Sequence, residues 1–547
     1  MKKLPLGIED FKELISQGYY YIDKTSLIQD VVKEKVCLYT RPRRFGKTLN
    51  MSMLYYFFSN KVHDIDSLFS NLEISHNQEI IKLKNQYPVI FLSFKDMKMD
   101  TFDHQIEWFQ LLIGELASQF PELYASSALD EIDKELFLKY RKKTASFGEI
   151  QNSLHQMSIF LRNHYQKNVV ILIDEYDVPL QSAYLNGYYE EMVSFLRNVF
   201  SSVLKTNSAL ERAVLTGCLR IAKESIFTGL NNFSVRSILD ESASVCFGFT
   251  QEEMNQILHD YDIDQYKETM QKWYDGYRFG RTDIYNPWSV LKYADQLVHT
   301  SDTYAQSYWA NTSSNDIIYR YISHGNLQMK RDFDQLISGR AICKKIKPEL
   351  TYREMDDMNN VYSFLLFSGY LKIKKRINRN EYELMIPNYE IKTIYEDIFQ
   401  EWAMEIQDSN RSKLIHALLN MDVEQANEIL NYILLQSVSY YDSQESFYHG
   451  FMIGLLSNEN MYSNIESGDG RSDIKYLPVN KEKRGFVLEL KVCREKDLYD
   501  TAVLACEQIR EQRYLESDLA RGYQDMIGYG IAFEKKRCFI KLFLPER

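Results

Sequence analysis

Residues 36–58 read VCLYTRPRRFGKTLNMSMLYYFF, a short apolar run followed by a basic turn and an amphipathic helical pattern. The letters GKT at 46–48 match the second half of the loop pattern GxxxxGK[ST]. In such a loop the backbone N–H groups at the helix start, here at Gly46, bind phosphate. Lys47 can reach the β- and γ-phosphates, and the Thr48 hydroxyl can ligate Mg²⁺. The stretch therefore predicts a phosphate-binding loop at the end of a strand.

The first half of this loop departs from the pattern. Arg41 stands where the pattern has a glycine, and that glycine normally permits the tight turn around the β-phosphate. Arg41, Arg43 and Arg44 add positive charge, so the loop can still hold an anion with an altered geometry. The sequence therefore leaves open whether a nucleotide is hydrolysed or only bound.

A second constellation lies in residues 169–180, VVILIDEYDVPL. Asp174 and Glu175 follow five apolar residues, and a buried parallel sheet delivers such side chains to its carboxyl edge. We interpret Asp174 as a Mg²⁺ ligand, directly or through water, and Glu175 as the group that polarises the attacking water. Asp177 is a third candidate acid. The alternative is a strand that ends in a solvated acidic turn.

The next apolar run, at 213–217, brings Thr216 to the end of another strand. A polar residue at that position can sense the γ-phosphate, and Arg220 could contact the nucleotide or a neighbouring subunit. Alternatively, Thr216 caps a helix and Arg220 forms a surface salt bridge. The sequence leaves both the functional and the structural interpretation open for each of these two residues.

The first half of the chain alternates apolar, β-branched runs with longer helical stretches, which predicts an α/β fold with a parallel, helix-covered sheet. We expect a P-loop NTPase domain at 1–284, a helical domain at 285–440 with a winged-helix element near 360–387 as an option, and a small α/β domain at 441–547. The expected strands of the first domain are 36–40, 88–94, 169–173 and 213–217. Those of the last domain are 471–477, 485–492, 526–533 and 538–544.

The composition is that of an ordinary globular protein, with 547 residues of which 45% are hydrophobic and 26% charged, so several cores can form. The net charge of −11 argues against a general polyanion binder, and any nucleic-acid contact must be local. The seven cysteines include no CxxC pair, which argues against a zinc site or a disulfide framework. Because no signal peptide or long apolar run is visible, we expect a cytoplasmic protein without membrane contact.

Asp473, Glu489 and Lys491 are the candidate site residues of the last domain. Because side chains alternate along a strand, Glu489 and Lys491 of VLELKV point to the same face. Asp473 of GRSDI comes from the preceding strand, so the two carboxylates can bind Mg²⁺, with Mn²⁺ as an alternative. The lysine can then orient a water for attack on a phosphodiester. The alternative is a surface ion pair on an edge strand.

Two further residues flank this constellation. Glu466, seven residues before Asp473, could add another metal ligand. His449 begins an apolar helix, and because a lone histidine there is usually structural, we leave it out of the ligand set.

The sequence resembles a bacterial AAA-ATPase-like family whose members carry a C-terminal PD-(D/E)xK-type nuclease domain. The resemblance implies a P-loop ATPase that binds ATP and Mg²⁺ and uses an additional catalytic glutamate, which Glu175 matches. It implies a restriction-endonuclease-like last domain, in which Ser472 replaces the signature proline. The segments that carry it are GIEDFKELISQGYYYIDKTSLI, RPRRFGKT, LIDEYDVP, LTGCLRI with LNN, WYDGYRFG, IYNPWSVL, ESGDGRSDI and LELKV.

The resemblance also bears on residues outside the two constellations. Gln508 and Tyr514 are similar to the glutamine-tyrosine feature of this nuclease class, which implies that Gln508 touches the attacking water or the DNA backbone while Tyr514 packs. Asp23 and Lys24 of GYYYIDKT could line a nucleotide pocket, although a packed aromatic turn explains that segment nearly as well.

Two functional hypotheses from different classes follow. The first is an enzyme in which ATP binding and hydrolysis are coupled to a divalent-metal-dependent nuclease, with DNA favoured over RNA as partner and a homo-oligomer as an option. The second is a binding switch that holds nucleotide without turnover and grips nucleic acid or a protein without cutting it.

Overall fold

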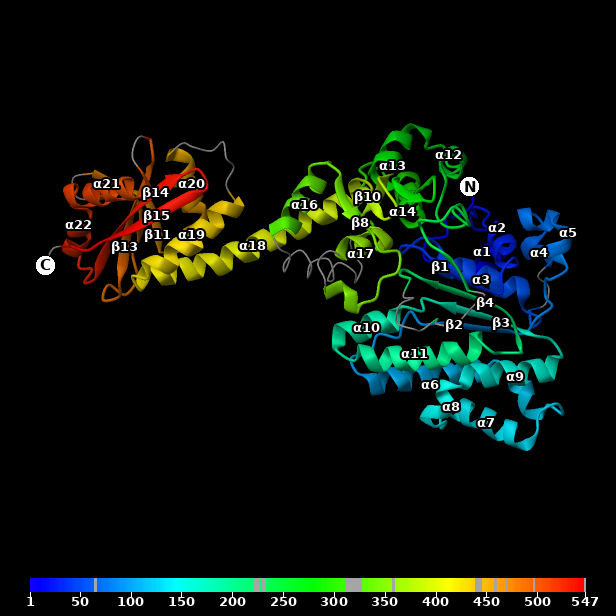
Figure 1. Cartoon of the computed structure of the whole chain (residues 1–547). Helices are drawn as coiled ribbons and strands as arrows, with labels where there is room; N and C mark the ends of the chain where they lie inside the picture. The colour runs from blue at the N-terminus through cyan, green and yellow to red at the C-terminus, as the bar shows by residue number, and fades with distance from the viewer. Residues whose placement is uncertain are drawn as a thin grey trace. The chain divides into compact units, whose positions relative to one another are not determined.

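The chain divides into two compact units, Met1–Ile398 and Phe399–Arg547; Figure 1 shows both. The sequence-based boundaries after residues 284 and 440 stay predictions. Within the described ranges, no helix is both long and apolar enough to cross a membrane. The computed structural model describes the chain except for residues 63–65, 221–226, 228–232, 310–326, 357–359, 438–444, 457–459, 468–469, 495–496 and 546–547.

A parallel five-stranded sheet in the order β2-β3-β4-β1-β5 forms the centre of the first unit. The four strands expected from the sequence are confirmed, and they are largely buried because helices cover both faces of the sheet. The fifth strand was missed because its four residues are only half-buried and contain no apolar run. The strands are β1 (Val36–Thr40), β2 (Val89–Ser93), β3 (Val169–Asp174), β4 (Leu210–Gly217) and β5 (Phe233–Arg236).

The strand order brings the important chain segments to one edge of the sheet. Strand β4 lies between β1 and β3, with Thr40 paired to Gly217. On the other side of β3, Ser93 is paired to Asp174. Since all these strands are parallel, their carboxyl ends lie at the same edge.

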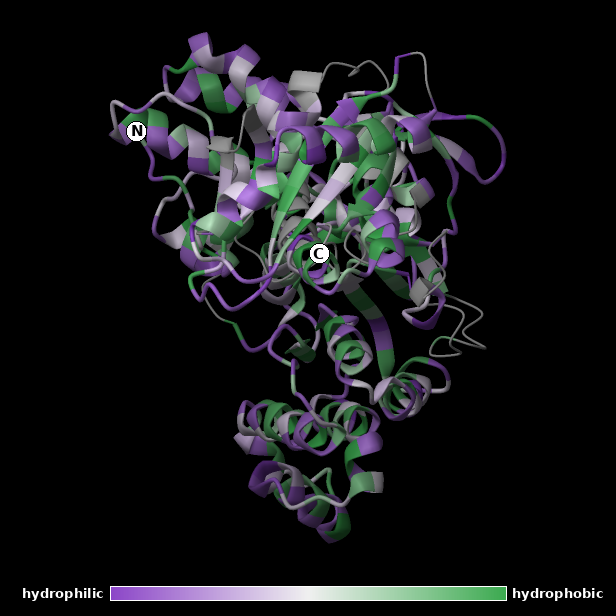
Figure 2. Cartoon of the chain, turned by 90° about the vertical axis from the view of Figure 1, so that its left-hand side faces the viewer, coloured by the Kyte–Doolittle hydropathy of each residue, from purple (hydrophilic) through white to green (hydrophobic). Residues whose placement is uncertain are grey.

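Helices cover this sheet on both sides, with α3 (Lys47–Phe58) on one side and α9 (Ser153–Tyr165) and α11 (Tyr189–Leu204) on the other (Figure 1). Figure 2 shows helices of the chain that carry both hydrophobic (green) and hydrophilic (purple) residues. Helices α9 and α11 are amphipathic, whereas α3 is buried over most of its residues, so the amphipathic pattern expected for it is wrong. The other α-helices described before residue 300 are α1 (Phe11–Ser16), α2 (Ser26–Val31), α4 (Asp66–Phe69), α5 (Gln78–Ile81), α6 (Phe102–Ser118), α7 (Glu131–Lys142), α8 (Phe147–Gln151), α10 (Val178–Asn186), α12 (Gln251–Asp260), α13 (Lys267–Tyr274) and α14 (Pro287–His299).

The middle of the chain is mainly helical, as expected, and also contains a three-stranded antiparallel sheet in the order β8-β10-β9. The order helix, strand, helix, strand, strand is compatible with the winged-helix interpretation, which stays a prediction. The elements are the hairpin β6 (Tyr277–Phe279) and β7 (Thr282–Ile284), then α16 (Leu327–Ile337), β8 (Ile342–Lys345), α17 (Val361–Ser368), β9 (Lys372–Arg376), β10 (Glu381–Met385) and α18 (Tyr389–Leu419).

The second unit is built on a mixed sheet in the order β11-β12-β13-β14-β15, in which only β13 and β14 pair in parallel. One face of the sheet packs on α18, α19 and α20, and the other on α21 and α22. Strand β11 was missed because its sequence, MYSNIES, is largely polar. The elements are α19 (Val423–Ser437), α20 (Glu445–Leu456), β11 (Met461–Ser467), β12 (Gly470–Tyr476), β13 (Gly485–Val492), α21 (Leu498–Glu511), α22 (Tyr514–Ala520), β14 (Met526–Glu534) and β15 (Arg537–Phe543).

A fully buried ion pair between Lys475 and Asp518 joins the sheet of this unit to α22. We expect Asp518→Ala to lower the free energy of unfolding by about 3 kcal/mol or more, because it removes the negative charge of Asp518 from beside a fully buried ammonium. Urea unfolding of the full chain, followed by circular dichroism, measures this loss. The exposed pair between Arg513 and Glu516 is the control, and Glu516→Ala is expected to cost less than ~1 kcal/mol. Equal effects of the two variants would contradict the prediction.

Candidate functional sites

The loop that joins β1 to α3 contains two residues with left-handed backbone conformation. Gly46 caps α3 with φ +78°, which glycine adopts without a steric penalty. Arg44 has φ +65°, where a side chain costs about 1 kcal/mol. A strained residue held in place by its surroundings is typical of a functional loop.

The Lys47 ammonium lies inside this loop. Its Nζ donates to the carbonyl oxygens of Arg41 and Pro42 at 3.2 and 3.0 Å, and it lies 3.8 Å from Cys218 Sγ. Burial lowers the pKa of Lys47, but Cys218, Glu175, Asp174 and Asp177 together raise the pKa above its ordinary value. The lysine is therefore a buried cation in an acidic environment at the end of the sheet.

Asp174 lies at the end of β3 and is bound by two hydroxyl groups. Thr48 Oγ1 donates to Asp174 Oδ2 at 2.7 Å, and the Thr216 hydroxyl donates to Oδ1. Burial raises the pKa of this carboxyl group, while the bonds from Thr216 and Thr48 lower it only in part. The structure thus brings together Thr48, Asp174 and Thr216, which lie on three separate elements.

Glu175 and Asp177 follow β3 but have different surroundings. Glu175 has φ +53°, is only half-buried, and donates its backbone N–H to Thr216 Oγ1 at 3.4 Å. The Asp177 carboxylate is buried and accepts the N–H groups of Cys218 and Leu219, both at 2.9 Å. Asp177 therefore fixes the chain after β4, and Glu175 is the acid that faces the open side of the site.

A cavity of about 650 Å³ adjoins the loop. Residues 43–50 and Glu175 contribute polar groups to its lining, while Phe249, Trp288 and Leu291 contribute apolar surface. The aromatic motifs near residues 273–288 are otherwise core, since Tyr274, Tyr277 and Tyr285 are buried. The cavity combines anion-binding groups with an apolar wall.

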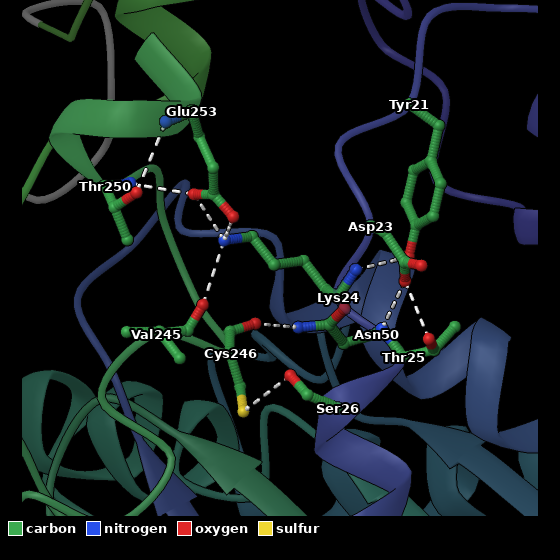
Figure 3. A network of polar contacts seen from close by, with 10 residues as sticks. All are labelled: Tyr21, Asp23, Lys24, Thr25, Ser26, Asn50, Val245, Cys246, Thr250 and Glu253. Atoms are coloured by element: carbon green, nitrogen blue, oxygen red, sulfur yellow. Dashed lines mark hydrogen bonds and ion pairs between the residues drawn. The ribbon is translucent and has the colours of Figure 1, made fainter. Parts of the chain in front are cut away.

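The network in Figure 3 ties the N-terminal segment to the wall of this cavity. Lys24 Nζ donates to both oxygens of Glu253 at 2.6 and 2.7 Å and to the Val245 carbonyl at 2.9 Å. Asn50 of α3 donates to the Cys246 carbonyl at 2.9 Å. Lys24 lines the cavity, yet its charge is already paired, so it shapes the wall instead of offering a free cation.

The arginines around the loop have separate partners. The buried Arg41 donates to the carbonyl oxygens of Thr40, Arg236 and Ala243 and is not among the residues that line the cavity. Burial lowers the pKa of Arg41 to about 10. Arg44 lies over the Trp288 ring, 4.9 Å from its centroid, and donates to the Tyr308 carbonyl. Arg220 forms an ion pair with Glu349 at 2.8 Å, as the structural alternative predicted.

Glu390, in the first turn of α18, binds the segment that Arg44 contacts. Its buried carboxylate accepts the Ser289 hydroxyl and the N–H groups of Tyr308 and Trp309, at distances of 2.8–3.0 Å. Burial raises the pKa of Glu390 to about 7. The carboxyl group is thus more easily protonated in the folded protein than in the unfolded chain.

This shift predicts that the first unit becomes less stable as the pH rises from about 4.5 to about 7. Below about pH 4.5 the Glu390 carboxyl group is protonated in both the folded and the unfolded protein. Above about pH 7 the folded protein must carry a buried negative charge at this residue. Between these pH values the wild type should lose on the order of 3 kcal/mol in its free energy of unfolding. Glu390→Gln mimics the protonated carboxyl group at every pH, so we expect this variant not to show that loss. Thermal unfolding at pH 5 and pH 7.5 measures the effect. The half-exposed Glu396 of the same helix provides the control variant Glu396→Gln, and an identical pH response of both variants would refute the assignment.

In the second unit, Asp473, Glu489 and Lys491 lie on the face of the sheet that α21 and α22 cover. Asp473 Oδ2 accepts the Leu490 N–H at 2.8 Å, which holds it against β13. Glu489 is 4% exposed, and Lys491 Nζ donates to Gln508 Oε1 at 2.5 Å. The structure therefore places the acid pair, the lysine and the α21 glutamine in one neighbourhood.

Tyr514 closes this neighbourhood from α22. The side chain is buried, and burial raises its pKa, with further increases from the negative charges of Glu489 and Asp473. It packs in the small core with Val487 and Ile509, as the resemblance implied. Glu466 lies on β11 opposite Arg471, but its side chain is outside the described residues.

His449, which the sequence predicts to be structural, lies beside Asp473. His449 Nε2 is 3.3 Å from the Asp473 carbonyl oxygen and 3.9 Å from Oδ1. Its place in the apolar helix α20 carried no signal of this contact, which depends on how α20 packs on the sheet. In the described part of the chain, no three His, Cys, Asp or Glu side chains gather closely enough to hold a metal by themselves. Asp473 and Glu489 could therefore supply two ligands at most between them, a number that suits an ion that keeps several waters.

The two sites lie in segments that match known families. Residues 5–227 match the family model described as "Predicted AAA-ATPase", and residues 443–543 match the "PD-(D/E)XK nuclease superfamily" model. The chain therefore combines an AAA-ATPase-like segment with a nuclease-superfamily segment, as the resemblance implied. It is also 26% identical over 402 residues to an "Uncharacterized protein in vnfD 5'region" of Azotobacter chroococcum mcd 1, across 72% of this chain and 68% of that protein.

Proposed function

We propose that the first unit binds and hydrolyses ATP with Mg²⁺, and that the second unit is a divalent-metal-dependent nuclease that cuts DNA in preference to RNA. The proposal rests on one observation: in each family segment, side chains suited to bind phosphate or metal are brought together from separate elements at the sheet. Asp174 accepts the hydroxyl groups of Thr48 and Thr216 in the first unit. In the second unit, Asp473 accepts the Leu490 N–H and Lys491 donates to Gln508. Carboxylate and hydroxyl oxygens of this kind are ligands that Mg²⁺ and Mn²⁺ prefer.

In the first unit, Lys47 and the N–H groups at the start of α3 bind the phosphates. Thr48 and Asp174 would hold Mg²⁺, which supplies neutralising charge on the phosphates when bound. Glu175 accepts the proton of the attacking water. Thr216 binds both Asp174 and the Glu175 N–H, and so holds the two acids in a fixed relation.

The cavity beside the loop accommodates the rest of the nucleotide. Phe249, Trp288 and Leu291 offer apolar surface for the base. The Lys24–Glu253 pair in Figure 3 anchors this wall, so that the base and the phosphate groups are received by one rigid frame.

In the second unit, Asp473 and Glu489 would hold Mg²⁺ or Mn²⁺, which supplies Lewis acidity at the phosphodiester when bound. Lys491 orients the attacking water, and Gln508 positions the lysine through the 2.5 Å hydrogen bond. His449 fixes the strand at Asp473 from the opposite side.

The test is to incubate the full chain with plasmid, linear and single-stranded DNA and with RNA, with Mg²⁺ or Mn²⁺, in the presence and absence of ATP. We expect metal-dependent DNA cleavage and the release of phosphate from ATP. Failure to cut any of these nucleic acids with either metal, together with no phosphate release, would overturn the proposal.

A nucleotide-dependent binding switch with a non-cleaving last domain is the second candidate. It is favoured by the loop itself, because Arg41 replaces a glycine and Arg44 holds a strained conformation where the phosphate would bind. A switch would bind ATP without releasing phosphate.

A further inference from the structure

Arg43 lies in the loop between β1 and α3 and lines the same cavity as Lys47 and Glu175. Its Nη2 donates to Gln181 Oε1 at 3.0 Å. Gln181 belongs to α10, which begins three residues after Glu175. The arginine is therefore held between the phosphate-binding loop and the helix that follows the catalytic acid.

The surroundings of Arg43 overlap with those of Lys47. Burial lowers the pKa of Arg43, but Cys218, Tyr352, Glu175 and Asp177 together raise it above its ordinary value. Three of these groups, Cys218, Glu175 and Asp177, also raise the pKa of Lys47. Arg43 and Lys47 therefore have three electrostatic neighbours in common, all of which follow the ends of β3 and β4.

The neighbouring arginines are engaged elsewhere. Arg41 donates to backbone carbonyl oxygens. Its Cζ atom lies 5.1 Å from the ring centroid of Phe247 and 5.0 Å from that of Phe279. Arg44 is held by Tyr308 and Trp288. Arg220, which the sequence suggested as a nucleotide contact, is paired with Glu349. Arg43 and Arg44 both line the cavity with Lys47 and Glu175, but of the four arginines only Arg43 is bonded to a side chain of α10, the helix that follows Glu175.

We infer that Arg43 is a catalytic residue of nucleotide hydrolysis, supplied by the same chain, whose guanidinium contacts the transferring γ-phosphoryl group. The inference rests on the proposed ATPase function. In this reaction the water oxygen bonds to the γ-phosphorus, the bond to the β,γ-bridging oxygen breaks, and the water proton passes to Glu175. ADP takes the bonding electrons, and the guanidinium neutralises the charge that builds on the phosphoryl oxygens. Gln181 is then a positioning residue for Arg43.

The test compares Arg43→Ala with Arg220→Ala in single-turnover hydrolysis of ATP by the full chain. We expect Arg43→Ala to lower the rate on the order of 10³-fold, as for other arginines that contact the transferring phosphoryl group. Arg220→Ala should leave the rate unchanged. Binding of ADP should change less than about threefold in Arg43→Ala, because the contact strengthens only in the transition state.

A second readout is the tightening of ADP binding by aluminium fluoride, which mimics the transferring phosphoryl group. In Arg43→Ala, aluminium fluoride should no longer tighten ADP binding. Gln181→Ala keeps the charge of Arg43 but loses its positioning, so in this variant aluminium fluoride should tighten ADP binding less than in the wild type. Arg43→Lys, which keeps a cation but loses the planar fork, should recover the tightening only in part and also serves if the alanine variant fails to fold.

Two results would overturn the inference. One is an Arg43→Ala protein that hydrolyses ATP and responds to aluminium fluoride like the wild type. The other is an equal loss of ADP and transition-state binding, which would indicate ground-state binding alone. If the wild type neither hydrolyses ATP nor binds ADP more tightly with aluminium fluoride, the proposed ATPase function fails as well, so the two failures are distinguishable.

Discussion

Glu489→Gln is expected to abolish metal-dependent cleavage of DNA, with a loss of several kcal/mol in transition-state stabilisation, on the order of 10³-fold in rate. Glu489 is almost fully buried on the same face as Lys491, where it forms one half of the proposed pair of acidic metal ligands with Asp473. The substitution keeps the shape of the side chain and removes the charge that, in the proposed site, would hold a divalent ion. Cleavage of labelled DNA at several Mg²⁺ and Mn²⁺ concentrations measures the effect.

The companion variant Lys491→Ala should lower the rate by about 10²–10⁴-fold without weakening metal binding, because the lysine acts on the water. Glu482→Gln makes the same chemical change as Glu489→Gln in an exposed turn of the same unit and should cut normally. If Glu489→Gln cleaved DNA as fast as Glu482→Gln, the proposed role of the Glu489 carboxylate in metal binding would be wrong.

Lys47→Ala should weaken ATP binding by about 10–100-fold, because it removes a charge-assisted hydrogen bond to the phosphates. Glu175→Gln should bind ATP normally and lose hydrolysis by about 10²–10⁴-fold, because the amide cannot accept the water proton. Calorimetric binding and phosphate release, measured on the same preparations, separate the two effects.

Glu191→Gln, on the exposed side of α11, is the matched control for the glutamate substitution and should hydrolyse normally. These variants also decide between the two proposed functions. A binding switch would lose ATP binding in Lys47→Ala, yet the wild type would have no turnover for Glu175→Gln to remove. Normal ATP binding by Lys47→Ala would contradict both functions.

The strands and the approximate positions of the acids were predictable because local patterns carry them. Runs of buried apolar residues mark β1, β2, β3 and β4. Since parallel strands end at the same edge, the order of Thr48, Asp174 and Thr216 along the chain already suggested that they meet. In β13, the two-residue alternation placed Glu489 and Lys491 on one face. Strands β5 and β11 were missed because they are short or polar and owe their existence to pairing with a neighbour.

The partners of the arginines and of His449 were decided by tertiary structure alone. Arg41, Arg43 and Arg44 lie within four positions of one another and have the same chemistry, so the sequence cannot rank them. Their partners, such as the Arg236 carbonyl, Gln181 and the Tyr308 carbonyl, lie more than 100 residues away. Local periodicity determines which residues are buried on an element, whereas the partner of a long polar side chain depends on which distant segment packs beside it.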